Sequence, residues 1–397
     1  MVGPRIAYET DGSRPVNVYL KGPFGVSLDC DGPEFMDNAN HPQHLLNDNA
    51  VRQSRPGIIF LANIVSKFVR PAINVLLNYI HPSSPHTVWH PLHEIGLKEY
   101  PASYAAYVII NFCLLILTAL IWINLLGKNP SPLALSLVSL VFFNSVVKIF
   151  FYLPHTQIFN VLMPTATYWI TAKSFEDDFL YKKITYWLMA ALGFGLLCYG
   201  TFIIPVIIFG TISLLRHWHL QKSIPWRALW RLVQYGFIFS APFVLWCLYV
   251  ISVKGTIYFH ESESCNQFVW MKKTFMTHGL LSMCTKYVNN ITSIILSGKE
   301  FLPVTLLLCI CAYFLVKKEA FTQHFKIASI ASISSLLFLA AMGFFPWRLA
   351  FIICMPIWIA ASLALNTIAA PRKEYIWLTY LFLIGYGIYL VLSPARF

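Results

Sequence analysis

The acidic residues of this chain are concentrated ahead of its first long apolar run. Seven of the 17 Asp and Glu residues precede this run, and Asp29, Asp31 and Glu34 belong to their densest stretch. Arg52 and Arg55 follow just before the run begins. A carboxylate can accept the proton of an attacking hydroxyl group, and an arginine can bind a phosphate through two parallel hydrogen bonds. Acids and arginines beside an apolar segment therefore suit chemistry on a lipid-linked phosphate.

Two other interpretations of the same residues stay open. Asp29 and Asp31 form a D-x-D pattern, and such hard oxygen ligands can hold a divalent metal ion. Three-residue patterns are also common by chance, so the sequence assigns no cofactor and leaves a divalent metal as an alternative. The second alternative is that the polar segment is simply solvated and that Arg55-Pro56 marks only the start of a helix.

The elements that must position these side chains are apolar. The chain has 397 residues, of which 57% are hydrophobic and 12% charged, and its mean hydropathy is +0.61. Soluble proteins carry roughly 25% charged residues, so about half of the usual charge is missing. Apolar runs long enough to cross a bilayer recur along the chain. We predict an all-α polytopic membrane protein with about ten transmembrane helices, near residues 58–80, 103–126, 132–150, 155–172, 185–214, 229–252, 301–317, 325–343, 347–366 and 375–394.

These runs divide the chain into four parts: an N-terminal loop region with the acidic motif (1–56), an N-terminal transmembrane bundle (57–252), a long loop (253–300) and a C-terminal transmembrane bundle (301–397). The stretch 275–297 is moderately apolar but contains a lysine and two asparagines. We therefore place it in the long loop, with an amphipathic helix as the alternative. We expect His260 and Glu261, in the same loop, to lie on a solvated surface, with contacts to a substrate as the alternative.

The orientation follows from the basic residues, because cytoplasmic loops are enriched in Lys and Arg. Three basic clusters, near residues 216–231, 317–326 and 372–373, fall on one side of the predicted topology, which we assign as cytoplasmic. The opposite side then holds residues 1–56, 173–184 and 253–300. The net charge of +12 is explained by the cytoplasmic loops and anionic membrane lipids, without nucleic acid. We expect an integral protein of the cell membrane.

No carboxylate falls at the centre of a predicted span. Ion-coupled carriers usually need buried acids at membrane depth, as proton relays or coupling sites. Their absence from the predicted spans argues against a proton- or sodium-driven carrier. It leaves a transferase, a channel and a lipid flippase open.

The polar segment before the first apolar run resembles part of a known family. Asp31-x-x-x-Phe35, followed by Arg52-x-x-Arg55-Pro56 at the start of an apolar helix, is similar to the first external loop of the integral-membrane glycosyltransferases with the C-type (GT-C) fold. In many of these enzymes this loop contains an Asp, an aromatic residue four positions later, and an Arg-Pro pair at the start of a span.

Two later segments resemble the same family. Leu153-Pro-His-Thr-Gln-Ile-Phe159 is similar to the short polar break that separates two helices in these enzymes. The resemblance places His155 and Gln157 at the substrate cavity. Phe345-Pro-Trp-Arg348 is similar to the start of their late, proline-containing span.

The resemblance implies a transferase that uses a polyprenyl-phosphate sugar donor at the extracytoplasmic face of the membrane. By position, Asp31 takes the role of the general base or of the residue that orients the acceptor. Asp29 and Glu34 are the substitutes for this role. Arg55 and Arg348, with Arg52 behind them, would bind the donor phosphate, because this phosphate leaves as an anion and needs electrostatic stabilisation.

The chain also departs from the family pattern. GT-C enzymes have a span before the first loop, so we expect that an upstream span is missing from this chain. Gln157 stands where an acidic residue is common. These departures keep a second hypothesis open, in which the chain is a non-catalytic membrane subunit or a lipid or polysaccharide translocation protein on the same scaffold.

Overall fold

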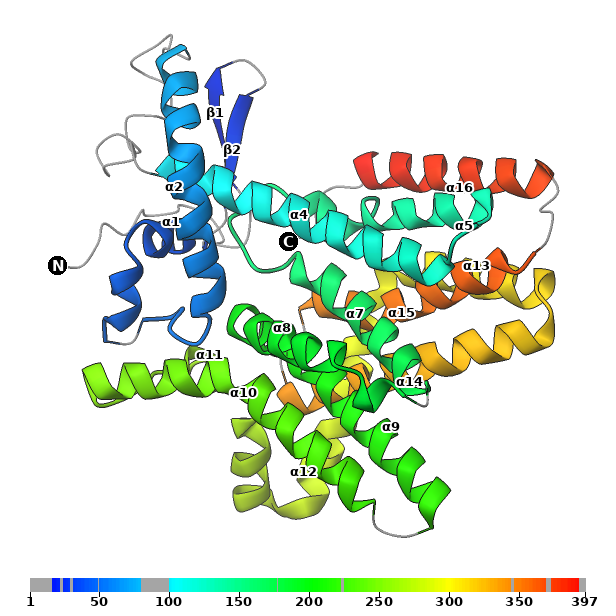
Figure 1. The fold of residues 1–397 in the computed structure, drawn as a ribbon. Coiled ribbons are helices and arrows are strands. Elements are labelled where there is room, and N and C mark those ends of the chain that lie inside the picture. Colours follow the sequence, from blue (N-terminus) through cyan, green and yellow to red (C-terminus); the bar gives the residue numbers. More distant parts are fainter. Residues whose placement is uncertain are drawn as a thin grey trace.

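Helices form almost all of the secondary structure in the described residues, which are 16–21, 24–28, 31–48, 50–79, 100–176, 178–222, 225–343, 346–368 and 373–392. The computed structural model also contains a β-hairpin, which the sequence did not indicate. Its strands β1 (Val16–Lys21) and β2 (Phe24–Leu28) pair antiparallel, with Val18 opposite Val26. The arrangement agrees with a helical, polytopic membrane protein (Figure 1).

Six helices within the described ranges are long and apolar enough to cross a membrane: α2 (Pro56–Tyr79), α4 (Tyr100–Leu126), α9 (Ile203–Gln221), α10 (Trp226–Lys254), α14 (Lys318–Met342) and α15 (Trp347–Asn366). A seventh span results if α12 (Val269–Ser297) and α13 (Leu302–Leu315), which are bent by 84° at their junction, count as one. The predicted count of about ten is not confirmed. The remaining helices are α1 (Gly32–Asn40), α5 (Pro132–Leu137), α6 (Ser145–Phe150), α7 (Phe159–Ser174), α8 (Ile184–Cys198), α11 (His260–Glu263) and α16 (Lys373–Leu392).

Two predicted spans are interrupted. The run 132–150 divides into α5, a 3-10 turn and α6, and Asn144 caps α6 by accepting a hydrogen bond from the backbone N–H of Val147 at 2.9 Å. The run 185–214 divides at Tyr199, whose extended backbone (φ −155°, ψ 119°) ends α8. As one straight helix this run of 30 residues would be about 45 Å long, well beyond the roughly 30 Å of a hydrocarbon core. Its length was the sequence signal for a break.

The break at Tyr199 changes the predicted topology. The Arg216 guanidinium, in the last turns of α9, donates a hydrogen bond to the carbonyl oxygen of Phe175, and Arg227 lies 5.1 Å from the ring centre of Tyr181. Lys326 of α14 lies 5.6 Å from the ring centre of Phe175. The loop 173–184 therefore lies at the same end of the bundle as two of the three basic clusters, 216–231 and 317–326. Its predicted place on the opposite side is wrong, because two helices occupy a run that was counted as one span.

The long loop 253–300 is largely helical. The stretch 275–297, which we placed in the loop, forms most of α12, with a kink at Gly279 where φ is 79°. Asn290, one of the polar residues behind that placement, is buried, and its side-chain amide donates a hydrogen bond to the carbonyl oxygen of Ala340 at 3.0 Å. A polar residue satisfied by a neighbouring helix therefore does not exclude a packed helix.

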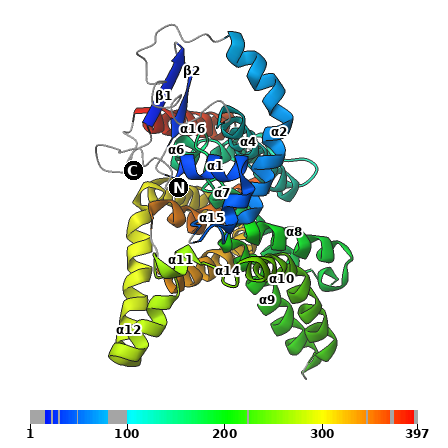
Figure 2. The same cartoon turned by 90° about the vertical axis from the view of Figure 1, so that its left-hand side faces the viewer.

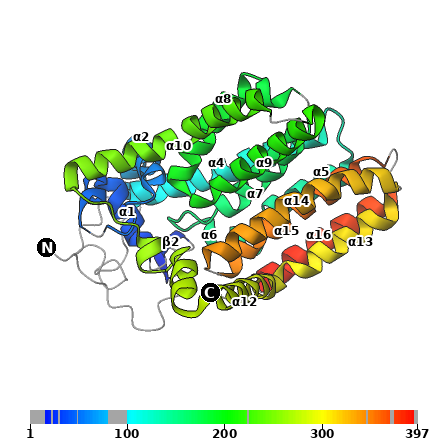
Figure 3. The same cartoon turned by 90° about the horizontal axis from the view of Figure 1, so that it is seen from below.

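The most buried of the long helices is α15, in which 83% of the most apolar stretch is buried inside the bundle. Ala360, Ala361, Ser362 and Ala364 are fully buried on it, and small residues of this kind let neighbouring helices approach closely. Figure 3 shows the long helices running alongside one another with α1 at one end, and Figure 2 shows α12 and the α9–α10 pair diverging below α11. The first turn of α15 carries Arg348 to the end where α1 lies.

Candidate functional site

A cavity of about 240 Å³ lies where α1 and α15 begin and where α8 gives way to α9. Six of the predicted catalytic and binding residues line it: Asp31, Arg52, Arg55, His155, Gln157 and Arg348. Glu34 lies beside the cavity, with a carboxylate oxygen 3.6 Å from Nε of Arg52. Asp29 lies outside the described residues. The structure brings the described candidates together, and their catalytic and binding roles stay predictions.

The start of α1 positions Asp31. Pro33 lies in the first turn, where a missing backbone N–H costs nothing. Asp31 is the N-cap residue, and its backbone carbonyl accepts the first helical hydrogen bond from the N–H of Phe35 at 3.1 Å. Its side chain does not cap the helix. The carboxylate instead turns towards side chains from two other segments.

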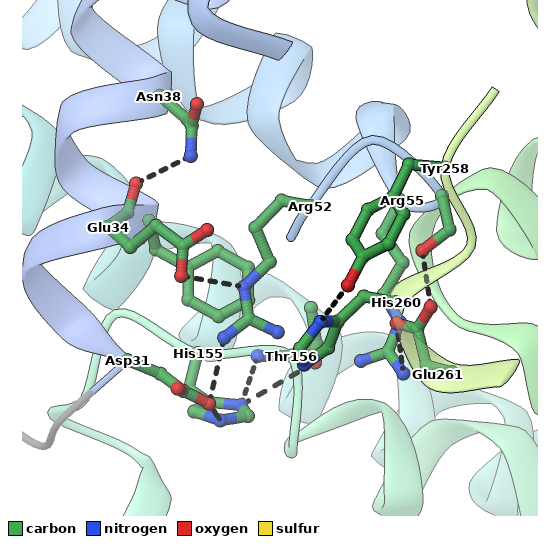
Figure 4. A network of polar contacts seen from close by, with 12 residues as sticks. Asp31, Glu34, Asn38, Arg52, Arg55, His155, Thr156, Tyr258, His260 and Glu261 are labelled. Atoms are coloured by element: carbon green, nitrogen blue, oxygen red, sulfur yellow. Dashed lines mark hydrogen bonds and ion pairs between the residues drawn. The ribbon is translucent and has the colours of Figure 1, made fainter. Parts of the chain in front are cut away.

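Arg52 and His155 converge on one oxygen of Asp31. Nη2 of Arg52 lies 2.9 Å and Nε2 of His155 lies 3.1 Å from Oδ2 of Asp31 (Figure 4). The other ring nitrogen of His155, Nδ1, accepts a hydrogen bond from the backbone N–H of Thr156 at 2.8 Å. Because a backbone N–H can only donate, Nδ1 has no proton, and the proton of the neutral ring is on Nε2. His155 therefore donates to Asp31 and orients it, rather than acting as a base.

The pKa values of Asp31 and Glu34 are shifted in opposite directions. Burial alone would raise the pKa of Asp31, but the His155 hydrogen bond and the charge of Arg52 outweigh it and hold this pKa well below its ordinary range. Burial raises the pKa of Glu34, and the charges of Asp31 and Asp37 add to the rise, while Arg52 opposes it. In the resting site Glu34 is consequently the stronger base, and Asp31 is firmly ionised.

Arg52 joins the acids to an aromatic residue of the same helix. It is only 6% exposed, and its guanidinium carbon lies 4.4 Å from the ring centre of Phe35. The spacing of Asp31 and Phe35, four residues apart, places both on one face of α1. The Tyr107 hydroxyl of α4 donates to the carbonyl of Phe35 at 3.1 Å, so α1 is fixed to the bundle behind the site.

A second ion pair lies in the same cavity. Nη2 of Arg55 is 2.9 Å from Oε1 of Glu261, and the Ser54 hydroxyl donates to Oε2 of Glu261 at 2.7 Å. Burial would raise the pKa of Glu261, but the charge of Arg55 and the Ser54 hydrogen bond bring it below its ordinary value. Glu261 was expected on a solvated surface, yet its side chain is only 15% exposed. Ser54 and Glu261 are 207 residues apart in the chain, and no local pattern points to their contact.

The remaining predicted residues come from the polar break and from α15. Asn111 of α4 holds the break by donating its side-chain amide to the carbonyls of Phe151 and Leu153 at 2.9 and 3.1 Å. Gln157, 4% exposed, accepts a hydrogen bond from the Asn160 amide at 2.8 Å. The guanidinium of Arg348 lies 5.5 Å from the ring centre of Phe150. Tyr199 and Thr201 were not among the predicted site residues, and they line the cavity because the α8–α9 break lies there.

A metal is not needed to explain the arrangement of the acids. Within the described ranges, no three or more His, Cys, Asp and Glu side chains form a group that could hold a metal ion. Asp31, the described half of the D-x-D pattern, already accepts hydrogen bonds from two nitrogen donors.

Together, the fold and the cavity define a helical membrane protein with a charged cavity at one end of its bundle. Comparison with protein-family models, with curated proteins and with solved structures found no match for the chain. What the cavity does must therefore be inferred from its own residues.

Proposed function

We propose that the chain is an integral-membrane glycosyltransferase of the GT-C type, which transfers a sugar from a polyprenyl-phosphate donor to a lipid, glycan or protein acceptor at the extracytoplasmic face. One observation carries this proposal. Asp31 and three arginines, from segments far apart in the sequence, line one cavity. That cavity is at the opposite end of the bundle from the basic loops, because Met342 lines it while Lys326 of the same helix lies sixteen residues away, roughly 24 Å along α14.

The chemistry divides the charged residues into two groups. The acceptor hydroxyl attacks the anomeric carbon of the sugar, its proton passes to a carboxylate, and the bond to the donor phosphate breaks with both electrons leaving on the phosphate oxygen. Asp31 is the candidate for the proton acceptor. Arg55 and Arg348 are the candidates for the phosphate, since Arg52 is committed to the acids. The buried Thr201 hydroxyl, which has no hydrogen-bond partner among the described residues, lies where a ligand oxygen can meet it.

One observation favours the second hypothesis, a non-catalytic membrane subunit or a translocation protein. Arg52 and His155 hold the pKa of Asp31 so low that it is a weak base in the resting site. Under this hypothesis the two donors are a structural clasp that fixes α1 to the bundle. The transferase instead requires that substrate binding weakens one of the two contacts to Asp31.

The two hypotheses separate in a transfer assay. Protein purified in detergent is given a radiolabelled polyprenyl-phosphate sugar with membrane lipid or oligosaccharide acceptors. We expect transfer by the unmodified protein and a loss of about 100-fold or more in Asp31→Asn, the usual contribution of a positioned base. Asp48→Asn is the matched control, because Asp48 is 91% exposed and contacts only the surface residue Lys254 in the described ion pairs. Donor binding without transfer would favour the second hypothesis, and full activity of Asp31→Asn would contradict the role of Asp31.

A further inference from the structure

The segment between α10 and α12 forms one wall of the cavity. Residues 255–268 contribute His260, Glu261, Cys265, Gln267 and Phe268 to its lining. Close to both ends the segment is attached through its backbone: the N–H of Tyr258 donates to Oε1 of Gln53 at 2.7 Å, and the N–H of Phe268 donates to the carbonyl of Met342 at 3.1 Å. The wall is therefore a short connection between two long helices. Two aromatic pairs also pack it against the bundle: Phe259 lies 6.2 Å from Phe243 of α10, and Phe268 lies 5.5 Å from Phe338 of α14, measured between ring centres.

Its central contact has the chemistry of an occupied anion site. The Glu261 carboxylate receives the guanidinium of Arg55 on one oxygen and the hydroxyl of Ser54 on the other (Figure 4). A guanidinium and a hydroxyl are the donors that also bind a phosphoryl group, and charge-assisted bonds of this kind are the strong ones. A phosphate and Glu261 cannot both use these donors. The protein's own carboxylate therefore holds the place of an anionic ligand.

The backbone of the segment is strained where it joins α12. Asn266 and Phe268 have φ angles of 53° and 60°, in the left-handed region. Asparagine tolerates this region, but a bulky residue such as phenylalanine is a genuine outlier there, and such outliers collect at clamps and switches. At the other end Gly255 has a φ of 77°, which glycine adopts without cost. The segment thus begins at a glycine that ends α10 and has a strained joint where it meets α12.

The cavity is smaller than most ligand sites. Its volume is about 240 Å³, whereas small-molecule sites usually measure about 300 to 1,000 Å³. Moving residues 255–268 outward would enlarge the cavity and release Arg55 in the same step, because Glu261 lies on that segment.

We propose that residues 255–268 form a lid and that Glu261 is its internal ligand, which occupies the anion site of Arg55 and Ser54 until a phosphoryl group displaces it. This inference rests on the proposed function for the identity of the phosphoryl group. The lid itself depends only on the contacts described above. Glu261 is then a regulatory contact and takes no part in the transfer.

The first test measures the lid without any ligand. Hydrogen exchange of the backbone amides in residues 256–268 is compared between unmodified protein, Glu261→Gln and Glu263→Gln. Glu263 lies on the same short helix but is exposed, so its variant controls for the change of residue type. We expect exchange in this segment to rise about tenfold in Glu261→Gln alone, as for a closed state populated about nine-tenths of the time. Equal exchange in all three proteins would overturn the lid.

The second test measures the anion site with farnesyl phosphate, a short-chain prenyl phosphate, by calorimetry in detergent. Removing an internal competitor should tighten binding about tenfold in Glu261→Gln, and the gain should vanish when Arg55→Gln is added. Weaker or unchanged binding in Glu261→Gln would mean that Glu261 is only a structural support. If no variant binds farnesyl phosphate, the donor class of the proposed function fails, and the exchange measurement still decides whether the lid exists.

Discussion

Replacing Arg52 by methionine is the most direct test of the charge arrangement at the start of α1. Arg52 is almost fully buried and holds two carboxylates, at 2.9 Å from Asp31 and 3.6 Å from Glu34. Methionine keeps much of the apolar stem but removes the cation. Removing one partner of a buried ion pair costs roughly 3 to 5 kcal/mol, because the other charge stays behind.

The expected magnitude lies at the lower end of this range. The side chains of Asp31 and Glu34 are 37% and 35% exposed, so water reaches them, and His155 continues to hold Asp31. We expect a loss of about 3 kcal/mol at pH 7.5, which lowers the midpoint of thermal unfolding by roughly 5 °C for a chain of this size. The measurement is a thermal unfolding scan of the purified protein in detergent.

The loss should shrink in acid. In the unmodified protein the lowered pKa of Asp31 stabilises the fold above its unfolded value of 3.8, and this contribution disappears only as the pH falls through the lower folded value. Between pH 7.5 and 5 it is therefore constant. In Arg52→Met the pKa values of both acids rise, and that of Glu34 is already raised by burial. The folded variant then binds more protons than the unfolded chain, so its stability increases as the pH falls.

A matched control separates the charge from the ring contact. Arg227 also lies over an aromatic ring, that of Tyr181, but it is exposed and is part of no described ion pair. Arg227→Met should change the unfolding midpoint little at either pH. If Arg52→Met is as stable as the unmodified protein, or is equally destabilised at pH 7.5 and pH 5, the buried ion pairs do not stabilise α1 as described.

Two further predictions concern the bundle. Single cysteines at Lys182 and Lys222 should react with an impermeant thiol reagent from the same side of the membrane, because α8 and α9 are separate helices. A cysteine at Asp48, which is 91% exposed, should react from the other side. Labelling of Lys182→Cys and Asp48→Cys from the same side would restore the topology predicted from the sequence. Gly193→Ala should cost about 1 to 3 kcal/mol, since a Cβ there would clash with the backbone oxygen of Phe239 in α10. Gly236→Ala, with nothing within 4 Å of the added Cβ, should be neutral or slightly stabilising in the same unfolding scan.

The parts of the site that the sequence predicted are local. Asp31 and Phe35 are one helical turn apart, and Arg52 and Arg55 flank one short turn, so their spacing alone indicates a shared surface. The proline beside His155 likewise marks an irregular segment that can face a cavity. What could not be predicted is which segment lies opposite. Glu261 meets Arg55 only because the whole bundle brings two distant segments together, and hydropathy records no such contact.

The errors in the fold have a related cause. Hydropathy measures how apolar a run is, but a bend of the backbone does not need a polar residue. Tyr199 ends α8 within an apolar run, and Asn290 is buried in α12 because the carbonyl of Ala340 accepts its amide hydrogen. Hydropathy therefore did not predict the break between α8 and α9, and the polar residues of α12 led us to place that helix in a loop. Run length, compared with the thickness of the bilayer, was the better guide in the first case.

The four residues before Pro56 connect the two halves of the site. Arg52 holds Asp31, while Ser54 and Arg55 hold Glu261. Between them, the side chain of Gln53 donates to the carbonyl of Leu45 at 2.7 Å and accepts from the backbone N–H of Tyr258 at 2.7 Å. The turn closes on itself through the N–H of Arg55, which donates to the carbonyl of Arg52 at 2.9 Å. The two arginines are therefore fixed relative to each other by a single turn. Arg52 pairs with Asp31, whereas Arg55 pairs with Glu261. The Arg52-x-x-Arg55 spacing therefore has a physical consequence. A movement of the lid that displaces Glu261 or Tyr258 acts on the same turn that holds Arg52 against Asp31.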